Sequence, residues 1–383
     1  MMRHKYYRFL VDSLYGRLFY FLLGMATLSA ILTIIFSPEN EHWGNAHPML
    51  RATNRKTIDE HIAGLNFNEA NIKTHKGYVK LDEINNKVFK PFGYEIIEPS
   101  LPVPTVRMMN EPKCEVVFSE WLKIAQQPQP DVPPKKFPKH QTDRFLLNGY
   151  TAMSEWYFND HSNTGDSPRN WNRISEFLNF TKTELGALAY NKDSESMYHA
   201  MGGYRLKGKR GFVVGSMQPW VEVMALKHGA KSILTVEYNP LTIQNEFKNR
   251  QSAISPVDFV KNWNLYAETF DFAASSSSIE HSGLGRYGDP LDPIGDLREM
   301  LKIRCMLKKG GLLFLAVPFG TDAIQYNAHR IYGSIRLALM FYGFDWLGTY
   351  SGDSEQAFDL TTTLLHSVEL YAIKHYTVVL RKV

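Results

Sequence analysis

The C-terminal half of this 383-residue sequence predicts an α/β fold, in which a mainly parallel sheet carries helices on both faces. Two short apolar runs, Gly211–Gly215 and Ser232–Val236, are separated by the helical stretch Val221–His228. Two more apolar runs, Phe270–Ser276 and Leu312–Pro318, also have a helical stretch between them. Runs of this length that alternate with helices are typical of buried parallel strands joined by crossover helices.

The first strand–helix–strand unit has the features of a nucleoside site. Gly215 ends the first strand, and the acid Glu237 ends the second strand twenty-two residues later. A glycine there lets a ligand approach the backbone, the next helix presents free N–H groups, and the acid can accept both ribose hydroxyls. Since the turn lacks the G-x-G-x-x-G pattern on which a pyrophosphate depends, a nucleoside without phosphates is favoured over NAD.

The later strands bring a resemblance to a known family. The pieces FDFAASS, SIEH and LKKGGLLFLAVP follow one another as in class I methyltransferases that use S-adenosylmethionine. This resemblance implies a Rossmann-like methyltransferase domain over residues 205–383, with an antiparallel last strand within 371–383. The stretch EHSGLGRYGDPLDPIGDL, residues 280–297, resembles more particularly a domain family of unknown function, known chiefly from nematodes and with bacterial relatives. It implies S-adenosylmethionine as the cofactor and no particular acceptor.

The resemblance also implies the residues of the cofactor site. Gly215 and Ser216 would line the methionine end, and Glu237 would hold the ribose; the alternative for Glu237 is a solvated carboxylate at a strand end. The remaining candidates are Asp258 near the adenine, after a third strand predicted near Ile254–Val257, and Ser275 and Ser276 at the tip of the fourth strand, where the methyl group would point.

Methyl transfer to a hydroxyl needs a base that removes the proton of the acceptor. His281 and Glu280 follow the fourth strand and are the first candidates, although both could instead only brace the loop. His329 is the second candidate, in a helix predicted over Asn327–Tyr342 beyond the fifth strand. No spacing of His, Cys, Asp and Glu predicts a metal site.

The N-terminus predicts a membrane anchor. Residues 18–36 carry no charge and would cover about 30 Å as a helix, close to the thickness of a bilayer core. The preceding residues 1–17 are basic, which places them in the cytosol and the rest of the chain in the lumen of the endoplasmic reticulum or Golgi, as a type II protein. A cleaved signal peptide and a buried core helix remain alternatives. The glycosylation sequon at Asn179 is consistent with a lumenal location.

Residues 37–140 are predicted to form a stem, with a short helix near Lys56–Leu65. Nine of the nineteen prolines lie within residues 99–138, so this part is predicted to be an extended spacer without regular helix. Residues 141–204 are predicted to be a helical accessory region that either packs as core or caps the ligand cleft. Cys305 lies in an apolar helical run and is predicted to be a buried packing residue rather than a functional thiol. One bridge between Cys114 and Cys305 is left open for an oxidising lumen.

The sequence therefore predicts a membrane-anchored O-methyltransferase that acts on a glycan or small molecule in the secretory pathway. The net charge of +4 and the lack of a basic stripe argue against nucleic acid as a partner. A catalytically silent binding or scaffold protein with the same fold is the main alternative. A transferase using sugar nucleotides is a further alternative, disfavoured because no clear D-x-D pattern is present.

Overall fold

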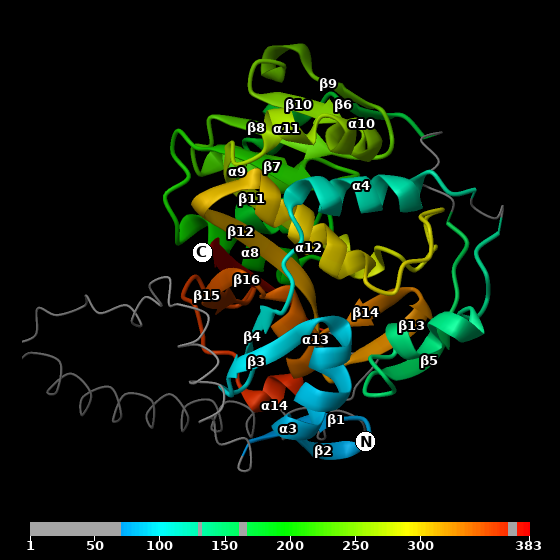
Figure 1. Cartoon of the computed structure of the whole chain (residues 1–383). Coiled ribbons are helices and arrows are strands. Elements are labelled where there is room, and N and C mark those ends of the chain that lie inside the picture. Colours follow the sequence, from blue (N-terminus) through cyan, green and yellow to red (C-terminus); the bar gives the residue numbers. More distant parts are fainter. Residues whose placement is uncertain (1–69, 129–131, 161–166, 367–373) are drawn as a thin grey trace, which may run out of the picture. The chain divides into compact units, whose positions relative to one another are not determined.

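A seven-stranded sheet forms the centre of the part of the chain that the computed structural model describes, residues 70–128, 132–160, 167–366 and 374–383 (Figure 1). In spatial order its strands are β10 (Gln251–Ile254), β8 (Ser232–Val236), β7 (Arg210–Val214), β11 (Phe270–Ser276), β12 (Leu307–Phe319), β16 (Lys374–Lys382) and β15 (Phe344–Tyr350). Numbered along the chain within this sheet, the order is 3-2-1-4-5-7-6. β16 is antiparallel to both of its neighbours, β12 and β15, and all other neighbouring pairs in this sheet are parallel. The predicted α/β fold and its antiparallel last strand are confirmed.

The register of the strands brings the carboxyl ends of β7, β8 and β11 to one edge of the sheet. Val214 lies beside Val236, and Val213 lies beside Ala274. The residues that follow these strands therefore meet at that edge, where open α/β sheets bind ligands. Side chains alternate between the faces, so Phe212 and Val213 enter different hydrophobic clusters on opposite sides.

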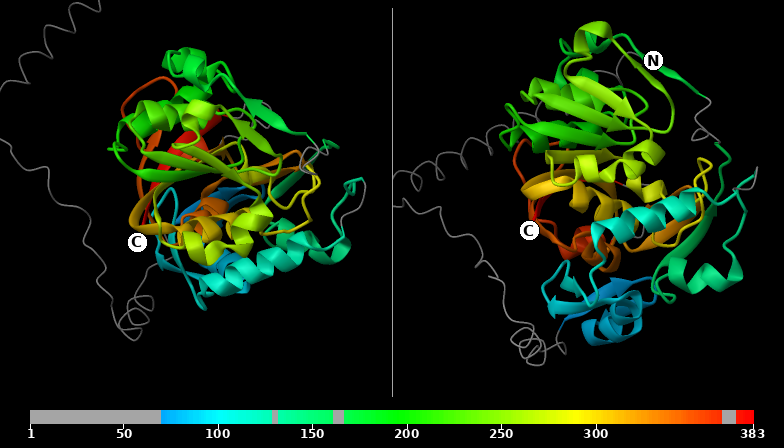
Figure 2. Two further views of the ribbon diagram at one scale, coloured as in Figure 1. Left: turned by 90° about the horizontal axis from the view of Figure 1, so that it is seen from above. Right: turned by 45° about the horizontal axis from the view of Figure 1, so that its top comes forward.

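Helices cover both faces of the sheet (Figure 2). The cluster on one face contains side chains of α6 (Ile174–Phe177), α7 (Lys182–Gly186), α8 (Lys192–Gly202) and α9 (Trp220–Lys227). The cluster on the other face contains side chains of α4 (Cys114–Ala125), α10 (Pro256–Lys261), α12 (Gly295–Met306) and α13 (Ser334–Met340). Short elements α11 (Trp263–Tyr266), α14 (Thr362–Leu365), η4 (Asn245–Phe247) and η5 (Ile279–His281) join the larger ones.

The third strand is displaced from its predicted place near Ile254–Val257. Strand β10 ends at Ile254, and Pro256 begins α10, whose N-cap is Ser255. Proline fits the first turn of a helix and cannot donate to a strand ladder, so the strand ends before it.

The segment predicted to be a stem contains regular structure from residue 70 onward. Its elements are β1 (Asn71–Thr74), β2 (Gly77–Lys80), α3 (Leu81–Ile84), the π-helix η1 (Asn85–Phe89), η2 (Lys90–Phe92), β3 (Tyr94–Glu98), β4 (Thr105–Met108), α4 and η3 (Lys139–Gln141). Val88 and Phe89 are fully buried in the same cluster as α12. The prediction of an extended spacer over residues 99–138 is wrong for α4, because residues 113–127 contain no proline and place an apolar stripe on the core.

The accessory region is only partly helical. Besides α5 (Thr142–Phe145) and α6 to α8, it contains strands β5 (Ala152–Trp156) and β6 (Arg169–Trp171). Strand β5 joins β13 (Ala323–Asn327) and β14 (His329–Ile331) in a second sheet, and β6 pairs with β9 (Leu241–Ile243). The helix predicted over Asn327–Tyr342 therefore begins only at Ser334, and His329 lies on a strand.

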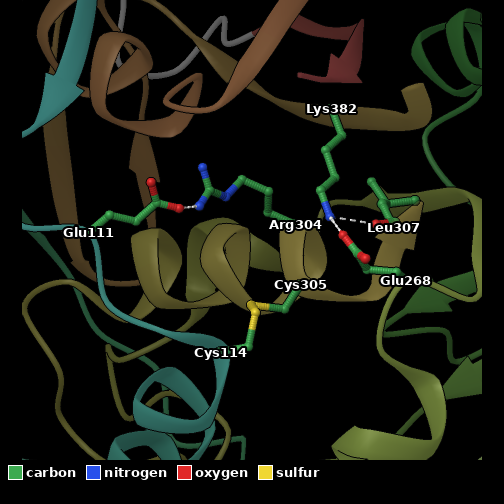
Figure 3. The surroundings of a disulfide bond; sticks show 7 residues. All are labelled: Glu111, Cys114, Glu268, Arg304, Cys305, Leu307 and Lys382. Atoms are coloured by element: carbon green, nitrogen blue, oxygen red, sulfur yellow. Dashed lines mark hydrogen bonds and ion pairs between the residues drawn. A yellow bond between two sulfur atoms is a disulfide. The ribbon is translucent and has the colours of Figure 1, made fainter. Parts of the chain in front are cut away.

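A disulfide joins Cys114, at the start of α4, to Cys305 in α12 (Figure 3). Cys305 is buried in the hydrophobic core, as predicted, and the bridge to Cys114 that the sequence left open is present. Arg304 beside it forms an ion pair with Glu111, so two contacts hold the start of α4 to α12. The predicted anchor at residues 18–36 and the predicted helix at Lys56–Leu65 lie outside the described residues. Within the described chain, no helix is both long and apolar enough to cross a bilayer.

Candidate functional site

A cavity of about 420 Å³ lies at the carboxyl edge of β7, β8 and β11, within the size range of small-molecule sites. Its walls include the three loops that follow these strands, Gly215–Gln218, Glu237–Asn239 and Ser276–Ser278. Segments outside the strand–helix core complete the walls, namely Trp121 and Ile124 of α4 and residues 188–190 before α8. The accessory region therefore contributes to the cavity, and its helices α6, α7 and α8 also pack in the core.

Gly215 occupies a position that only glycine fits. Its φ is +70°, and a Cβ there would lie 2.1 Å from Oγ of Ser278. The backbone N–H of the next residue, Ser216, donates to Oε2 of Glu237 at 3.1 Å. The glycine turn thus brings the loop after β7 against both neighbouring loops.

Glu237 lies in the cavity wall and is 8% exposed. Besides Ser216, its carboxylate accepts hydrogen bonds from the backbone N–H and side-chain amide of Asn239, at 3.1 and 3.2 Å. A buried carboxylate fixed between two loops differs from the solvated strand-end acid considered as the alternative. Its place is suited to accept the hydroxyls of a ribose.

A second buried acid, Glu222 in α9, was not predicted as part of the site. Its carboxylate lies 3.0 Å from Oγ of Ser216 and 2.9 Å from Oγ1 of Thr235. Burial raises the pKa of Glu222 to about 7. The only sign of Glu222 in the sequence is an acid inside the apolar helix that follows Gly215. Its hydrogen bond with Ser216 holds the loop after β7 against α9.

Two predicted cofactor residues do not reach the cavity. Asp258 is exposed at the start of α10, where its carboxylate accepts from Oγ of Ser255 at 2.8 Å. Ser275 is fully buried, and its hydroxyl donates to the carbonyl of Val214 at 3.2 Å. Of the two serines only Ser276 lines the cavity, and the wall beside Glu237 contains Tyr238, Pro256 and Phe259.

His281 lines the cavity from η5. Its Nδ1 lies 2.6 Å from the carbonyl oxygen of Ala328 and must donate the hydrogen, because a carbonyl only accepts. Nε2 of the neutral ring is therefore a hydrogen-bond acceptor. Burial lowers the pKa of His281 to about 3, which keeps the ring neutral.

The other two candidates for a base lie behind this wall. Glu280 is fully buried, and its Oε1 is 3.8 Å from Nε2 of His281. Burial raises the pKa of Glu280 to about 7. The ring of His329 lies 6.3 Å from that of His281, centroid to centroid, and packs edge-on against Trp156 outside the cavity lining. Burial lowers the pKa of His329 to about 4. The structure thus gathers all three predicted groups but places only His281 on the cavity.

Two buried arginines hold residues 280–297 in place, the stretch that resembles the nematode domain family. Arg336 donates to both carboxylate oxygens of Asp296 at 2.6 and 2.7 Å. Arg330 donates to the carbonyls of Ser282 at 2.5 Å and Asp292 at 3.3 Å. The loop between η5 and α12 is therefore wrapped around these two side chains. The sequence did not predict a role for either arginine, because both lie in a segment that was predicted to be an ordinary helix. Within the described residues, no cluster of His, Cys, Asp and Glu is arranged to hold a metal ion.

The strand order and the antiparallel β16 define a Rossmann-like fold of the class I methyltransferase type. Residues 208–383 match the family described as Caenorhabditis protein of unknown function, DUF268, which confirms the resemblance to a nematode family.

Solved structures with low sequence identity are also similar to this chain. One is a 1,6-didemethyltoxoflavin-N1-methyltransferase from Burkholderia thailandensis with bound S-adenosylhomocysteine, at 14% identity, 55% coverage of this chain, 86% of that chain and a TM-score of 0.35. The [4+2]-cyclase SpnF matches at 13% identity over 60% of this chain and 98% of that chain, with a TM-score of 0.36. A putative S-adenosylmethionine-dependent methyltransferase from Listeria monocytogenes matches at 12% identity over 49% and 98% of the two chains, with a TM-score of 0.30. No curated protein matches the chain.

Proposed function

We propose that this chain is a membrane-anchored methyltransferase that uses S-adenosylmethionine to methylate a hydroxyl of a glycan or small molecule in the secretory pathway. The observation that carries the proposal is that Gly215 and Glu237 line one cavity at the carboxyl edge of this sheet. The glycine lets the loop after β7 pack against Ser278 at the cavity, and the fixed carboxylate can accept from a ribose. The apolar side chains of Pro256 and Phe259 on the same wall suit a nucleobase.

Hydroxyl groups in the cavity wall favour an uncharged, hydroxylated acceptor. Ser277 and Tyr190, whose hydroxyls are 2.9 Å apart, line the cavity together with His281. Two charged groups of the loop after η5 already have partners. Asp289 accepts from the N–H of Gly283 at 2.7 Å, and Arg286 pairs with Asp160 at 2.8 Å.

In this proposal the bound cofactor supplies an electrophilic methyl group. His281 then accepts the proton of the acceptor hydroxyl on Nε2, since Nδ1 is committed to the carbonyl of Ala328. Ser276 at the tip of β11 faces the same cavity and would line the point of transfer.

Calorimetry of the purified full-length chain with S-adenosylhomocysteine tests the cofactor site. Glu237→Ala should weaken binding about tenfold to hundredfold, because a hydrogen bond to a charged group is worth about 1.5–3 kcal/mol. Gly215→Val should abolish binding, because its side chain would clash with Ser278. Glu246→Ala, an exposed acid outside the cavity lining, is the matched control and should bind normally. Unchanged affinity in both site variants, with normal folding, would remove the proposed site.

Transfer of a labelled methyl group to a panel of methyl glycosides and phenols tests the chemistry. His281→Ala should keep its cofactor affinity and lose about 10²–10⁴-fold in turnover, the usual effect of a general base. His329→Ala should transfer at nearly the normal rate, since His329 is outside the cavity lining. A normal rate in His281→Ala would show that histidine is not the base.

A catalytically silent binding protein is the second candidate. One observation favours it: burial lowers the pKa of His281 to about 3, which makes the ring a weak base. Tight binding of S-adenosylhomocysteine with no transfer to any member of the panel would support this candidate over the enzyme.

The secretory part of the proposal depends on the uncharged run at residues 18–36 and on the disulfide. A bridge between Cys114 and Cys305 supports folding in an oxidising compartment, because disulfides persist there and are rare in the cytosol.

A further inference from the structure

Arg169 is a cationic residue in the cavity wall that does not belong to β7, β8 or β11, the strands that end at the cavity. It begins β6, in the accessory region, and lines the cavity with the loops after β7 and β8. Its Nε is buried without a hydrogen-bond partner among the described residues. A buried polar group without a partner is costly, so its presence beside a cavity points to a ligand.

The other basic side chain in this wall, Lys302, is already neutralised. Its Nζ is 2.7 Å from Oε1 of Glu299 and lies 4.0 Å from the ring centre of Trp121. Glu237 also has its own partners in Ser216 and Asn239. Arg169 forms no ion pair with any carboxylate of the described chain, so its charge remains available to a ligand.

The pairing of β6 shows which way Arg169 faces. β6 runs parallel to β9, with Arg169 beside Leu241 and Trp171 beside Ile243. Residues two apart share a face of a strand, and the intervening Asn170 is exposed, so Arg169 and Trp171 share the inner face. Nε1 of Trp171 donates to the carbonyl of Met217 at 3.4 Å. The inner face of β6 therefore lies against the loop that begins with Gly215.

We propose that Arg169 binds the carboxylate at the amino-acid end of the cofactor, an inference that rests on the proposed function. The planar guanidinium matches a carboxylate with two parallel hydrogen bonds. Glu237 would hold the ribose and Arg169 the carboxylate, so two side chains of opposite charge in one cavity would bind one ligand. The matched family region begins at residue 208, so this contact comes from a segment outside that region.

Calorimetry on the full-length chain with two ligands tests the inference. S-Adenosylhomocysteine carries the carboxylate, and its decarboxylated analogue keeps the nucleoside, sulfur and amine. Arg169→Gln should weaken binding of S-adenosylhomocysteine about tenfold to hundredfold, as the loss of charged hydrogen bonds predicts. The same substitution should change binding of the decarboxylated analogue less than about threefold, since the contact it removes is absent from that complex.

Arg173→Gln is the matched control, because Arg173 lies in the same segment and pairs with Glu176 on the surface. It should bind both ligands as the unmodified chain does. Arg169→Lys keeps the charge and should lose less affinity than Arg169→Gln, which separates ligand recognition from a folding defect.

Equal weakening of both ligands in Arg169→Gln, or no change in either, would overturn the assignment while leaving the cofactor site in place. A chain that binds neither ligand, with Arg169 and Glu237 intact, would overturn both this inference and the proposed function.

Discussion

At the scale of single residues, the environment of each side chain determines its chemistry. Glu280 and His281 are neighbours in the sequence, but burial raises the pKa of the first to about 7 and lowers the pKa of the second to about 3. Both shifts favour the neutral form, as expected where charge is poorly solvated. The two candidates are thus held as a protonated acid and a neutral imidazole near pH 6.

The raised pKa of Glu280 predicts a dependence of stability on pH. A folded-state pKa above the ordinary value of 4.5 stabilises the fold at pH below 4.5, and this contribution is lost as pH rises through about 7. Relative to Glu280→Gln, the unmodified chain should lose up to about 3 kcal/mol of unfolding free energy between pH 4.5 and pH 8. Denaturant unfolding at several pH values measures this difference. Glu246→Gln, an exposed control, should differ from the unmodified chain by a constant amount. A constant difference for Glu280→Gln would show that Glu280 titrates normally.

The sequence predicted the site residues that end well-defined strands. Gly215, Glu237 and Ser276 follow apolar runs, and all three line the cavity. Asp258 was misplaced because Pro256 ends the third strand early, and Ser275 because successive strand residues face opposite ways. Tertiary contacts that only the fold creates, such as the insertion of Arg169 from β6, leave no local pattern in the sequence.

At the scale of elements, helix α4 forms both a wall of the cavity and a bridge to the core. Trp121 and Ile124 face the cavity, and Cys114 at the start of the helix is bonded to Cys305 in α12. Figure 3 shows this disulfide beside Arg304, which pairs with Glu111 of the preceding loop. The many prolines of residues 99–138 predicted an extended spacer there, but they lie on either side of α4 and not within it. Sequence patterns predicted the buried strands well but not this packing of distant segments.

Removal of the disulfide should loosen α4 and weaken the cofactor site. The bridge closes a loop with a sequence separation of 191 residues, and loss of a native disulfide typically costs about 2–5 kcal/mol. Cys114→Ser with Cys305→Ser should lower the unfolding free energy by that amount and reduce affinity for S-adenosylhomocysteine. Dithiothreitol should have the same effects on the unmodified chain and none on the double variant, which is the control. Equal stability of the unmodified chain with and without dithiothreitol, after thiol titration confirms reduction, would contradict the prediction.

At the scale of the whole molecule, segments before the matched family region complete the core. Residues of α3, η1 and α4 lie in the same hydrophobic cluster as β11, β12 and α13. The cavity is likewise closed by α4, β6 and residues 188–190. The methyltransferase-type sheet and its N-terminal cover therefore form one packed unit, although the sequence suggested a domain that follows a spacer.

The orientation of the chain across a membrane is tested by Asn179. This asparagine is exposed after α6, and Thr181 of its sequon caps α7. If residues 18–36 anchor the chain with its basic end in the cytosol, Asn179 faces the lumen and should receive a glycan. Translation of the full chain with microsomes should give a product that shifts in mobility and returns to its original mobility after glycosidase treatment.

Asn179→Gln should lose the shift yet stay protected from added protease until detergent is present. Digestion of the chain by protease without detergent would place the body in the cytosol and overturn the orientation. A mature N-terminus near residue 30, with protection retained, would instead show that the apolar run is cleaved as a signal peptide.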